Sequence, residues 1–535
     1  MMSKKRSIAA LLCVILILSS LMIGCKGEEK KVSEDQTGKN DTEQTNQQVD
    51  REDGQGVKLP LVDKPTTIRW ATRENWYPEA PLSSGLPIWK EIEEKTNIKI
   101  EWETPADYDN AIKTRLAANA DLPDIVGMPW PGDPTIYGES GVLIPLEKMI
   151  EEQGHNIQKV FEDYPNAKKL HTTGDGHIYG LAAVIRGSAD LNTMCFFVRK
   201  DWLDELGLQE PDTLDDWYVM MSAFKQKGEM TNTDILPFAG DGFRFCGAFG
   251  LTLNCSDYGF GVDSNGKVVY QWILPEMKEL LAWWSKMYKE GLIRGWPSRD
   301  QIVNNQVGSM YYYPDLIPKV IYDLRANGYT NAVYIPVKPP AGPDGKRSLE
   351  RDADITTVFH GITATSPNKE AAFKLLDYMW SEEGIRYMAW GMENVSYVME
   401  DGKPKYTEWA LNNPDGLGVT EALRTLGAWP TIPWVQQSDT YAQLHSQIPE
   451  LARIPEVVTP YHVDTFPKLL ATKEEQDRLA ELDALHHYRG DMILKFFTGQ
   501  ESLDKFDDFV KSLKDMNLDE LLEIKQRQYD RTFKN

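Results

Sequence analysis

The sequence predicts an α/β protein with more than one lobe, and three observations lead to this. The chain of 535 residues is too long for a single hydrophobic core. Residues 66–146 alternate short β-branched runs with amphipathic stretches, a βαβα rhythm typical of a mainly parallel sheet with helices on both faces. A further strand-and-helix unit follows much later, within residues 352–397.

The first strand is predicted at 66–71 and the second at 98–102, with a helix between them that ends near Asn97. A further helix begins near Tyr108, and a turn with a third strand follows at 121–126. Ligands of such sheets bind outside the carboxyl ends of the strands. This rule points to the side chains just past the strands, which are Arg73, Trp76 and Trp130.

The unit at 352–397 reads as a buried strand followed by a capped helix. Residues 354–365 are dense in β-branched side chains, with His360 and Gly361 in the middle. Ser366-Pro367 supplies a helix N-cap and a proline of the first turn. The apolar side chains that follow share one helix face: Ala372, Leu375, Leu376 and Met379.

The N-terminus has the pattern of a secretory signal. Lys4, Lys5 and Arg6 precede an apolar run at 8–23, and Gly24-Cys25 follows. A cysteine after a small residue is similar to the lipobox of bacterial lipoproteins, so we expect cleavage after residue 24 and a lipid on Cys25. The lipobox usually has Leu three residues before the cysteine, where this chain has Met22. An uncleaved anchor is the alternative, although the run is short for a membrane span.

Composition narrows the function classes. The net charge of −23, with no basic run beyond the first six residues, argues against a nucleic-acid partner. Residues 26–58 have almost no apolar side chains and are expected to form a disordered tether. Cys246 and Cys255 either pair in an oxidising exterior or remain buried free thiols.

No motif indicates catalysis. Residues 261–267 fit the spacing of a phosphate-binding loop, but Val268 stands where a magnesium-binding Ser or Thr is needed. Asn265-Gly266 between two apolar runs instead predicts a β-hairpin. The sequence shows no GxSxG, no HExxH and no cysteine with a recognisable partner, so neither catalytic residues nor a cofactor are predicted.

Several segments, in order, resemble the extracellular solute-binding proteins of carbohydrate ABC importers, in their large lipoprotein branch. The unit at 352–397 resembles that family's return crossover into the first lobe. Similar segments over residues 66–535 are 122–126 with Trp130, 141–146, 176–181 with 197–203, 308–313 and 516–531. Some members carry a calcium loop after the helix that Thr213 and Asp216 cap, but here residues 228–234 lack the alternating oxygen ligands, so no metal site is expected.

The resemblance implies a two-lobed periplasmic-binding-protein-like fold of class II, with discontinuous lobes and a hinge near 182–186 and 359–362. The expected divisions are a signal peptide at residues 1–24 and a tether at residues 25–62. Residues 63–184 form the first part of lobe 1, residues 185–358 the main part of lobe 2, and residues 359–390 return into lobe 1. Residues 391–535 form a C-terminal segment that supplies cleft loops and helices.

The resemblance also implies a ligand cleft between the lobes, and tryptophan stacking on sugar rings suits the 16 tryptophans of the chain. Core packing is the alternative for each of them. Besides the three residues past the strands, the predicted ligand contacts lie in loops or crossovers: Arg186, Arg244, Trp296, Asp315, Trp390, Glu393, and the indoles Trp429 and Trp434 of a proline-stiffened loop.

The function expected from the resemblance is capture of an oligosaccharide and its delivery to an ABC permease. The protein would be a monomer, tethered by its lipid to the extracellular face of a Gram-positive cell membrane. A peptide-binding member of the same class, a secreted polysaccharide-active enzyme and a surface adhesin are the alternatives.

Overall fold

The computed structural model describes residues 51–52, 58–75, 77–130, 132–185, 189–253, 259–351, 353–447 and 449–534. The signal segment, most of the tether and Cys25 lie outside the described residues, as do Trp76, Arg186 and Cys255. Within the described ranges, none of the helices combines the length and apolar character that a membrane crossing requires.

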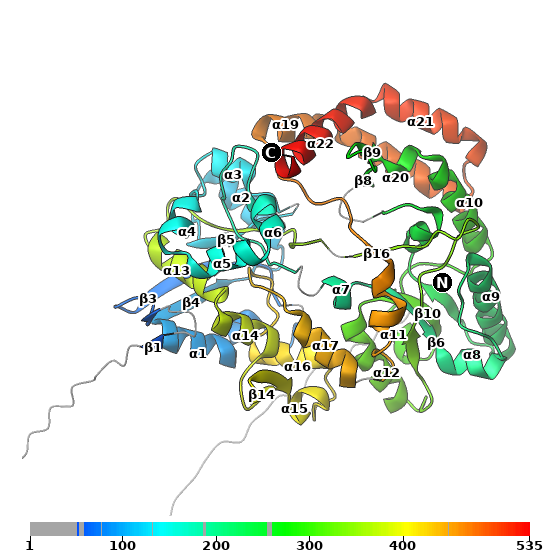
Figure 1. Ribbon diagram of the computed structural model, residues 1–535, viewed down its shortest axis with the longest axis horizontal. Helices are drawn as coiled ribbons and strands as arrows, with labels where there is room; N and C mark the ends of the chain where they lie inside the picture. Colours follow the sequence, from blue (N-terminus) through cyan, green and yellow to red (C-terminus); the bar gives the residue numbers. More distant parts are fainter. Residues whose placement is uncertain are drawn as a thin grey trace, which may run out of the picture. The chain divides into compact units, whose positions relative to one another are not determined.

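The first sheet has the strand order β13-β5-β3-β4. The strands β3 (Thr66–Ala71), β4 (Ile98–Glu103) and β5 (Ile125–Gly127) run parallel, as the βαβα rhythm predicts, and β13 (His360–Ile362) pairs with β5 in the antiparallel direction. Its helices, seen around the sheet in Figure 1, are α1 (Pro87–Thr96), α2 (Tyr108–Ala118), α3 (Thr135–Glu139), α4 (Glu147–Gln153), α5 (His155–Asp163), α6 (Pro165–His171), α13 (Lys369–Met379) and α14 (Glu382–Trp390).

The second sheet has the order β11-β6-β10-β7, in which only β10 and β7 are parallel. The βαβα rhythm of residues 66–146 made no prediction for this sheet, in which the strand directions are mixed. Its strands are β6 (Cys195–Arg199), β7 (Leu236–Ala239), β10 (Val307–Tyr312) and β11 (Tyr334–Pro336). The helices nearby in sequence are α7 (Ala189–Asn192), α8 (Lys200–Leu206), α9 (Leu214–Thr231), α10 (Pro275–Lys289), α11 (Arg299–Val303) and α12 (Ile317–Ala326).

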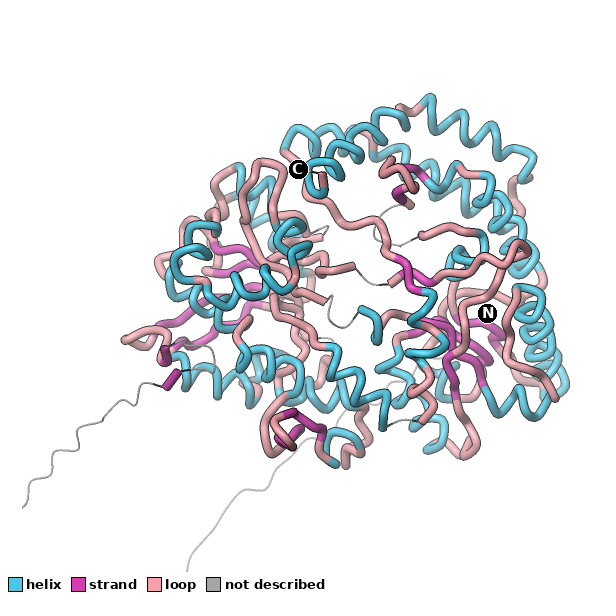
Figure 2. Tube along the Cα trace, in the orientation of Figure 1, coloured by secondary structure: helices cyan, strands magenta, loops and turns pink. Residues whose placement is uncertain are grey.

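Smaller elements complete the fold (Figure 2). The predicted hairpin at Asn265-Gly266 is confirmed, since β8 (Phe260–Val262) and β9 (Val268–Tyr270) are antiparallel. The other short pairs are β1 (Arg51–Glu52) with β2 (Lys58–Leu59), β12 (Leu349–Glu350) with β16 (His462–Val463), and β14 (Tyr397–Glu400) with β15 (Lys403–Tyr406). The C-terminal helices are α15 (Glu408–Leu411), α16 (Val419–Leu426), α17 (Ser438–Gln447), α18 (Ile454–Val457), α19 (Lys473–Glu481), α20 (Asp483–Thr498), α21 (Phe506–Asp515) and α22 (Leu518–Phe533).

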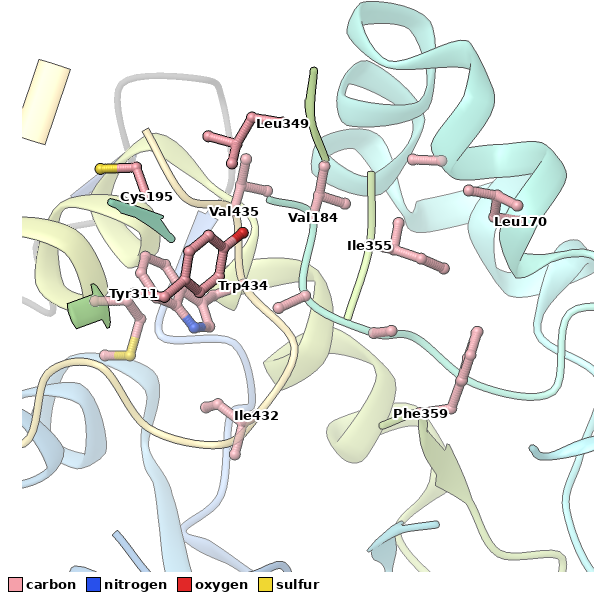
Figure 3. Close-up of a cluster of buried hydrophobic side chains, with 14 of the residues drawn as sticks. Leu170, Val184, Cys195, Tyr311, Leu349, Ile355, Phe359, Ile432, Trp434 and Val435 are labelled. Atoms are coloured by element: carbon pink, nitrogen blue, oxygen red, sulfur yellow. The ribbon is translucent and has the colours of Figure 1, made fainter. Parts of the chain in front are cut away.

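Three segments cross side by side between the parts of the chain that carry the two sheets: residues 181–185, 354–360 and 432–436. Val184 N–H donates to the Trp434 carbonyl at 2.9 Å, and the Val184 carbonyl accepts from the third segment at 2.8 Å. The sequence pointed to the first two segments and missed the third. Figure 3 shows buried side chains from all three: Val184, Ile355, Phe359, Trp434 and Val435.

The first two crossing segments approach each other closely. Leu181 and His360 exchange backbone hydrogen bonds of 2.9 and 2.7 Å. A Cβ atom on Gly180 would lie 2.9 Å from the His360 carbonyl oxygen, and one on Gly361 would lie 2.6 Å from the Tyr179 carbonyl oxygen. Both positions therefore require glycine, because backbone atoms cannot move aside at low cost.

The helix of the return unit begins later than predicted. Its first residue is Lys369, and Asn368 is the N-cap residue. Ser366, the predicted cap, instead donates its hydroxyl to the Asp124 carboxylate and accepts from the Asn368 N–H. A buried carboxylate beside the sheet was the stronger partner for that hydroxyl.

Buried histidines fix the crossing segments. The Ala182 N–H donates to Nε2 of His171 at 2.9 Å, so the opposite nitrogen carries the proton that His171 donates to the Ala167 carbonyl at 2.6 Å. In the second segment the Trp70 indole donates to Nδ1 of His360 at 3.0 Å, and Nε2 of His360 donates to the Thr431 carbonyl at 3.0 Å. Each ring is thus required in its neutral form.

Burial lowers the pKa of His360 to about 3 and that of His171 to about 4. Burial also lowers the pKa of His445 in α17 to about 4. These values lie below the ordinary value near 6.5, so the unfolded chain binds more protons than the folded one between pH 6.5 and 4. The stability that the neutral rings contribute is complete above pH 6.5 and is lost as the pH falls toward 4.

We expect the substitution His445→Leu to stabilise the protein selectively at low pH. Both ring nitrogens of His445 lack a hydrogen-bond partner among the described residues, so leucine removes a titrating group without breaking a bond. Relative to the wild type, the free energy of unfolding should rise by about 2 kcal/mol more at pH 5 than at pH 8.

Urea unfolding followed by circular dichroism at the two pH values measures this difference. The exposed His487 in α20, substituted by asparagine, is the control. An equal effect of His445→Leu at both pH values would contradict the prediction.

Candidate functional site

The residues past β3 and β5 come together around Asp109, in the first turn of α2. The carboxylate of Asp109 pairs with the guanidinium of Arg73, 36 residues earlier, and accepts the backbone N–H of Trp130, 21 residues later, at 2.8 Å. The guanidinium of Arg73 also lies 5.3 Å from the centroid of the Tyr108 ring. Sequence reasoning predicted Arg73 and Trp130 but missed Asp109, whose signal is a carboxylate in the first turn of a helix that follows a strand.

Trp130 is 49% exposed and lines a cavity of ≈ 570 Å³. We refer to it as the Trp130 cavity. Its walls come from the first-sheet part and from the C-terminal helices, which bring together aromatic faces and polar side chains. The lining residues are Lys113, Pro129, Trp130, Asp133, Ile136, Tyr137, Phe260, Thr357, Phe466, Pro467, Lys468, Leu469, Ala471, Gln476, Asp477, Leu479, Ala480, Asp483, His486 and Lys525.

Most of this lining was not predicted from the sequence. The segment 466–471 and the helices α19, α20 and α22 supply more than half of it, and their sequences read as ordinary loop and amphipathic helix. The mixture of apolar rings and a few convergent polar groups is the usual character of a small-molecule site, and the volume lies in the usual range.

The second-sheet part carries another pair of predicted residues, which we call the Arg244–Trp296 pair. The guanidinium of Arg244 lies 5.6 Å from the Trp296 ring and 5.0 Å from the Tyr311 ring, an arrangement in which a cation is attracted to both rings. Trp296 is 48% exposed. The pair does not belong to the lining of the Trp130 cavity, so the two form separate candidate contacts.

The half-buried carboxyl of Glu350 interacts with Arg244 of the Arg244–Trp296 pair. Burial raises the pKa of Glu350 to about 7, and the thiol of Cys246 donates to its Oε1 atom at 2.6 Å. Cys246 and Cys195 are both buried free thiols. Of the two possibilities for Cys246, the structure therefore shows the free thiol, whereas Cys255 lies outside the described residues.

Two predicted sugar-stacking residues are core residues instead. Trp390 is 0% exposed and donates its indole N–H to Gln437 at 3.2 Å, and Trp434 is 3% exposed. The prediction that their rings are presented to a ligand is wrong in this structure. The loop is held against the end of α14, since Trp429 N–H donates to the Met388 carbonyl at 3.2 Å.

The remaining predicted contacts are dispersed. Trp429 is half-buried against Trp434, with ring centroids 5.6 Å apart. Glu393 is exposed and lines neither the Trp130 cavity nor the Arg244–Trp296 pair. Asp315 joins two parts of the chain by accepting from Thr420 at 3.2 Å, and its burial, partly offset by Arg424, raises its pKa.

No group of His, Cys, Asp and Glu side chains suited to hold a metal ion occurs among the described residues. In the segment 228–234, Asp234 is paired instead with Arg294 at 2.9 Å.

Residues 81–385 match the family described as bacterial extracellular solute-binding protein. The chain belongs to this family. A curated relative is the fructooligosaccharide ABC transporter substrate-binding protein FusA of Streptococcus pneumoniae, 26% identical over 523 residues, which cover 89% of this chain and 92% of the relative. Lipoprotein LipO of Bacillus subtilis is 23% identical over 373 residues, covering 65% of this chain and 70% of the relative.

A solved structure confirms the fold. Alginate-binding protein AlgQ2, solved without calcium ion, superposes with a TM-score of 0.74 at 24% identity, covering 88% of this chain and 99% of that one. The predicted two-lobed α/β fold of the solute-binding proteins is therefore correct. The two sheets are the centres of the two lobes, and the three crossing segments connect them.

The exposure of the indoles predicts their order of oxidation. N-bromosuccinimide should modify Trp130 and Trp296 first, because about half of each side chain is accessible, and should modify Trp390 and Trp434 only after unfolding. Peptide mapping by mass spectrometry at increasing reagent gives the order. Early oxidation of Trp390 would contradict the assignment of that ring to the core.

Proposed function

We propose that this solute-binding protein captures an oligosaccharide between its lobes and delivers it, unaltered, to an ABC permease. The observation that carries the proposal is the Trp130 cavity, in which an exposed indole and other rings stand beside lysine, aspartate and glutamine side chains. Sugars have apolar ring faces and polar edges, and this lining matches both. The names of FusA and AlgQ2 support the ligand class.

The contacts proposed for the ligand are Arg73 and Trp130 on lobe 1 and the Arg244–Trp296 pair on lobe 2. Trp76 and Arg186 remain proposals from sequence alone. The three crossing segments are the proposed hinge, because a waist of short extended segments allows two lobes to close on a ligand. The domain boundaries given in the sequence analysis also remain proposals.

Isothermal titration with a panel of purified oligosaccharides and peptides tests the proposal against its alternatives. Binding of a saccharide, with no new reducing ends after prolonged incubation, is expected. Binding of peptides alone would favour a peptide-binding member, and new reducing ends would favour a polysaccharide-active enzyme.

We expect Trp130→Ala to weaken binding of the saccharide at least tenfold. The substitution removes the largest exposed ring of the cavity, and a lost aromatic contact costs about 0.5–1.5 kcal/mol beyond the lost apolar area. Calorimetry with the best saccharide of the panel measures the change. Tyr322→Ala, which removes another exposed ring that is not part of the cavity lining, is the control. An unchanged affinity in Trp130→Ala would exclude Trp130 from the site.

We also propose that the mature protein begins at Cys25 and carries a lipid there, which places it on the extracellular face of the cell membrane. The name of LipO supports this. Intact mass spectrometry of the membrane-extracted protein should show loss of residues 1–24 and the added mass of a diacylglyceryl group, which Cys25→Ala abolishes. A protein that retains Met1 would contradict the proposal.

A further inference from the structure

The inner wall of the Trp130 cavity carries more cations than anions. Lys468 and Lys525 are half-buried there, together with one half-buried carboxylate, that of Asp133. The other carboxylates of the lining, those of Asp477 and Asp483, are exposed. A charge acts more strongly on a ligand from a partly buried position than from the exposed rim, because water screens it less.

Lys468 contacts the second crossing segment, which leads into β13 of the first sheet. Its ammonium group donates to the Thr357 carbonyl, in the second crossing segment, at 2.9 Å. Burial lowers the pKa of Lys468 to about 8; Asp133 opposes this effect, while Lys525 and Arg73 add to it. The amine is thus still protonated at neutral pH, and two neighbouring cations repel it.

Lys525 reaches the cavity from α22. Its ammonium group lies 5.6 Å from the Phe260 ring and donates to Gln528 at 3.1 Å. It therefore places a second positive charge in the cavity lining, next to an aromatic face.

Gln476 adds a neutral donor to the cavity lining. Its side-chain NH₂ group is buried and has no hydrogen-bond partner in the part of the chain that the structure describes. A buried donor without a partner costs about 1–3 kcal/mol, and an acceptor on a bound molecule would remove this cost.

The carboxylates of the lining already have partners. Asp133 accepts the Thr135 N–H at the start of α3 at 2.8 Å. Asp477 pairs with Lys473 at 2.8 Å, and Asp483 lies 3.1 Å from a ring nitrogen of His487. The half-buried part of the lining therefore presents two ammonium groups and the Gln476 amide donor against one carboxylate, which already accepts a hydrogen bond.

We propose that the Trp130 cavity selects an acidic oligosaccharide, one whose sugars carry carboxylates, and that Lys468, Lys525 and Gln476 recognise a carboxylate of the ligand. This inference rests on the proposed function and specifies its substrate class. In a chain with a net charge of −23, an anionic ligand is repelled elsewhere on the surface, so its capture depends on these local cations.

A matched pair of ligands tests the proposal on the full mature chain. Trigalacturonate and its fully methyl-esterified form have the same sugars and length but differ in charge, and a neutral fructotriose serves as a third probe. Calorimetry should show trigalacturonate binding at least tenfold more tightly than the ester, with an affinity that falls as sodium chloride is raised from 20 to 500 mM.

Two variants test the assigned residues. Lys468→Met should reduce the preference for the acid over the ester at least tenfold, and Lys148→Met, which removes an exposed lysine of α4, is the matched control. Gln476→Leu should lower the affinity for trigalacturonate several-fold. The melting temperature of the free protein should stay unchanged or rise, because the substitution removes a buried donor without a partner. The second variant keeps the test valid if Lys468→Met fails to fold.

The possible outcomes separate the two proposals. Equal or tighter binding of the ester or of fructotriose would overturn the acidic class and leave oligosaccharide capture standing. If trigalacturonate binds tightly and neither variant weakens its binding, the assignment of Lys468 and Gln476 as carboxylate contacts would be overturned. Binding of no saccharide in the panel would overturn the proposed function itself, and the present inference with it.

Discussion

The fold depends on one neutral imidazole at the waist between the lobes. His360 accepts a hydrogen bond from the Trp70 indole in the first sheet and donates one to Thr431 in the loop before the third crossing segment. A protonated ring has no acceptor for the indole, so the site requires the neutral form. This geometry joins a strand of lobe 1 to two of the three segments that connect the lobes.

The three crossing segments also explain the direction of β13 and the position of the candidate site. The strand β13 begins at the end of the crossing segment 354–360 and runs away from it, whereas β5 runs toward it. The two strands are therefore antiparallel. The carboxyl ends of β3 and β5 consequently face the waist, and Asp109 links Arg73 and Trp130 there. Segment 466–471 and the C-terminal helices supply more than half of the cavity lining.

The site was only partly predictable. The rule for strand ends found Arg73 and Trp130, since it depends on local order along the chain. Arg244 and Trp296 were chosen separately as loop residues, and only the structure shows that they touch. Trp390 and Trp434 were assigned wrongly, because a tryptophan beside a loop and a tryptophan in the core have the same local sequence. Lys468, Lys525 and Gln476 had no local signal.

The sequence alone determined the α/β class, the parallel strands of the first sheet, the hairpin at Asn265-Gly266 and the capped helix at Thr213, because each of these follows from periodicity or turn chemistry within a short segment. Two of the three crossings were expected from the family resemblance. The tertiary structure alone decided the third crossing, the mixed directions of the second sheet, which indoles are exposed and which charges line the cavity. These depend on contacts between residues far apart in sequence, such as Trp70 with His360, which no local pattern encodes.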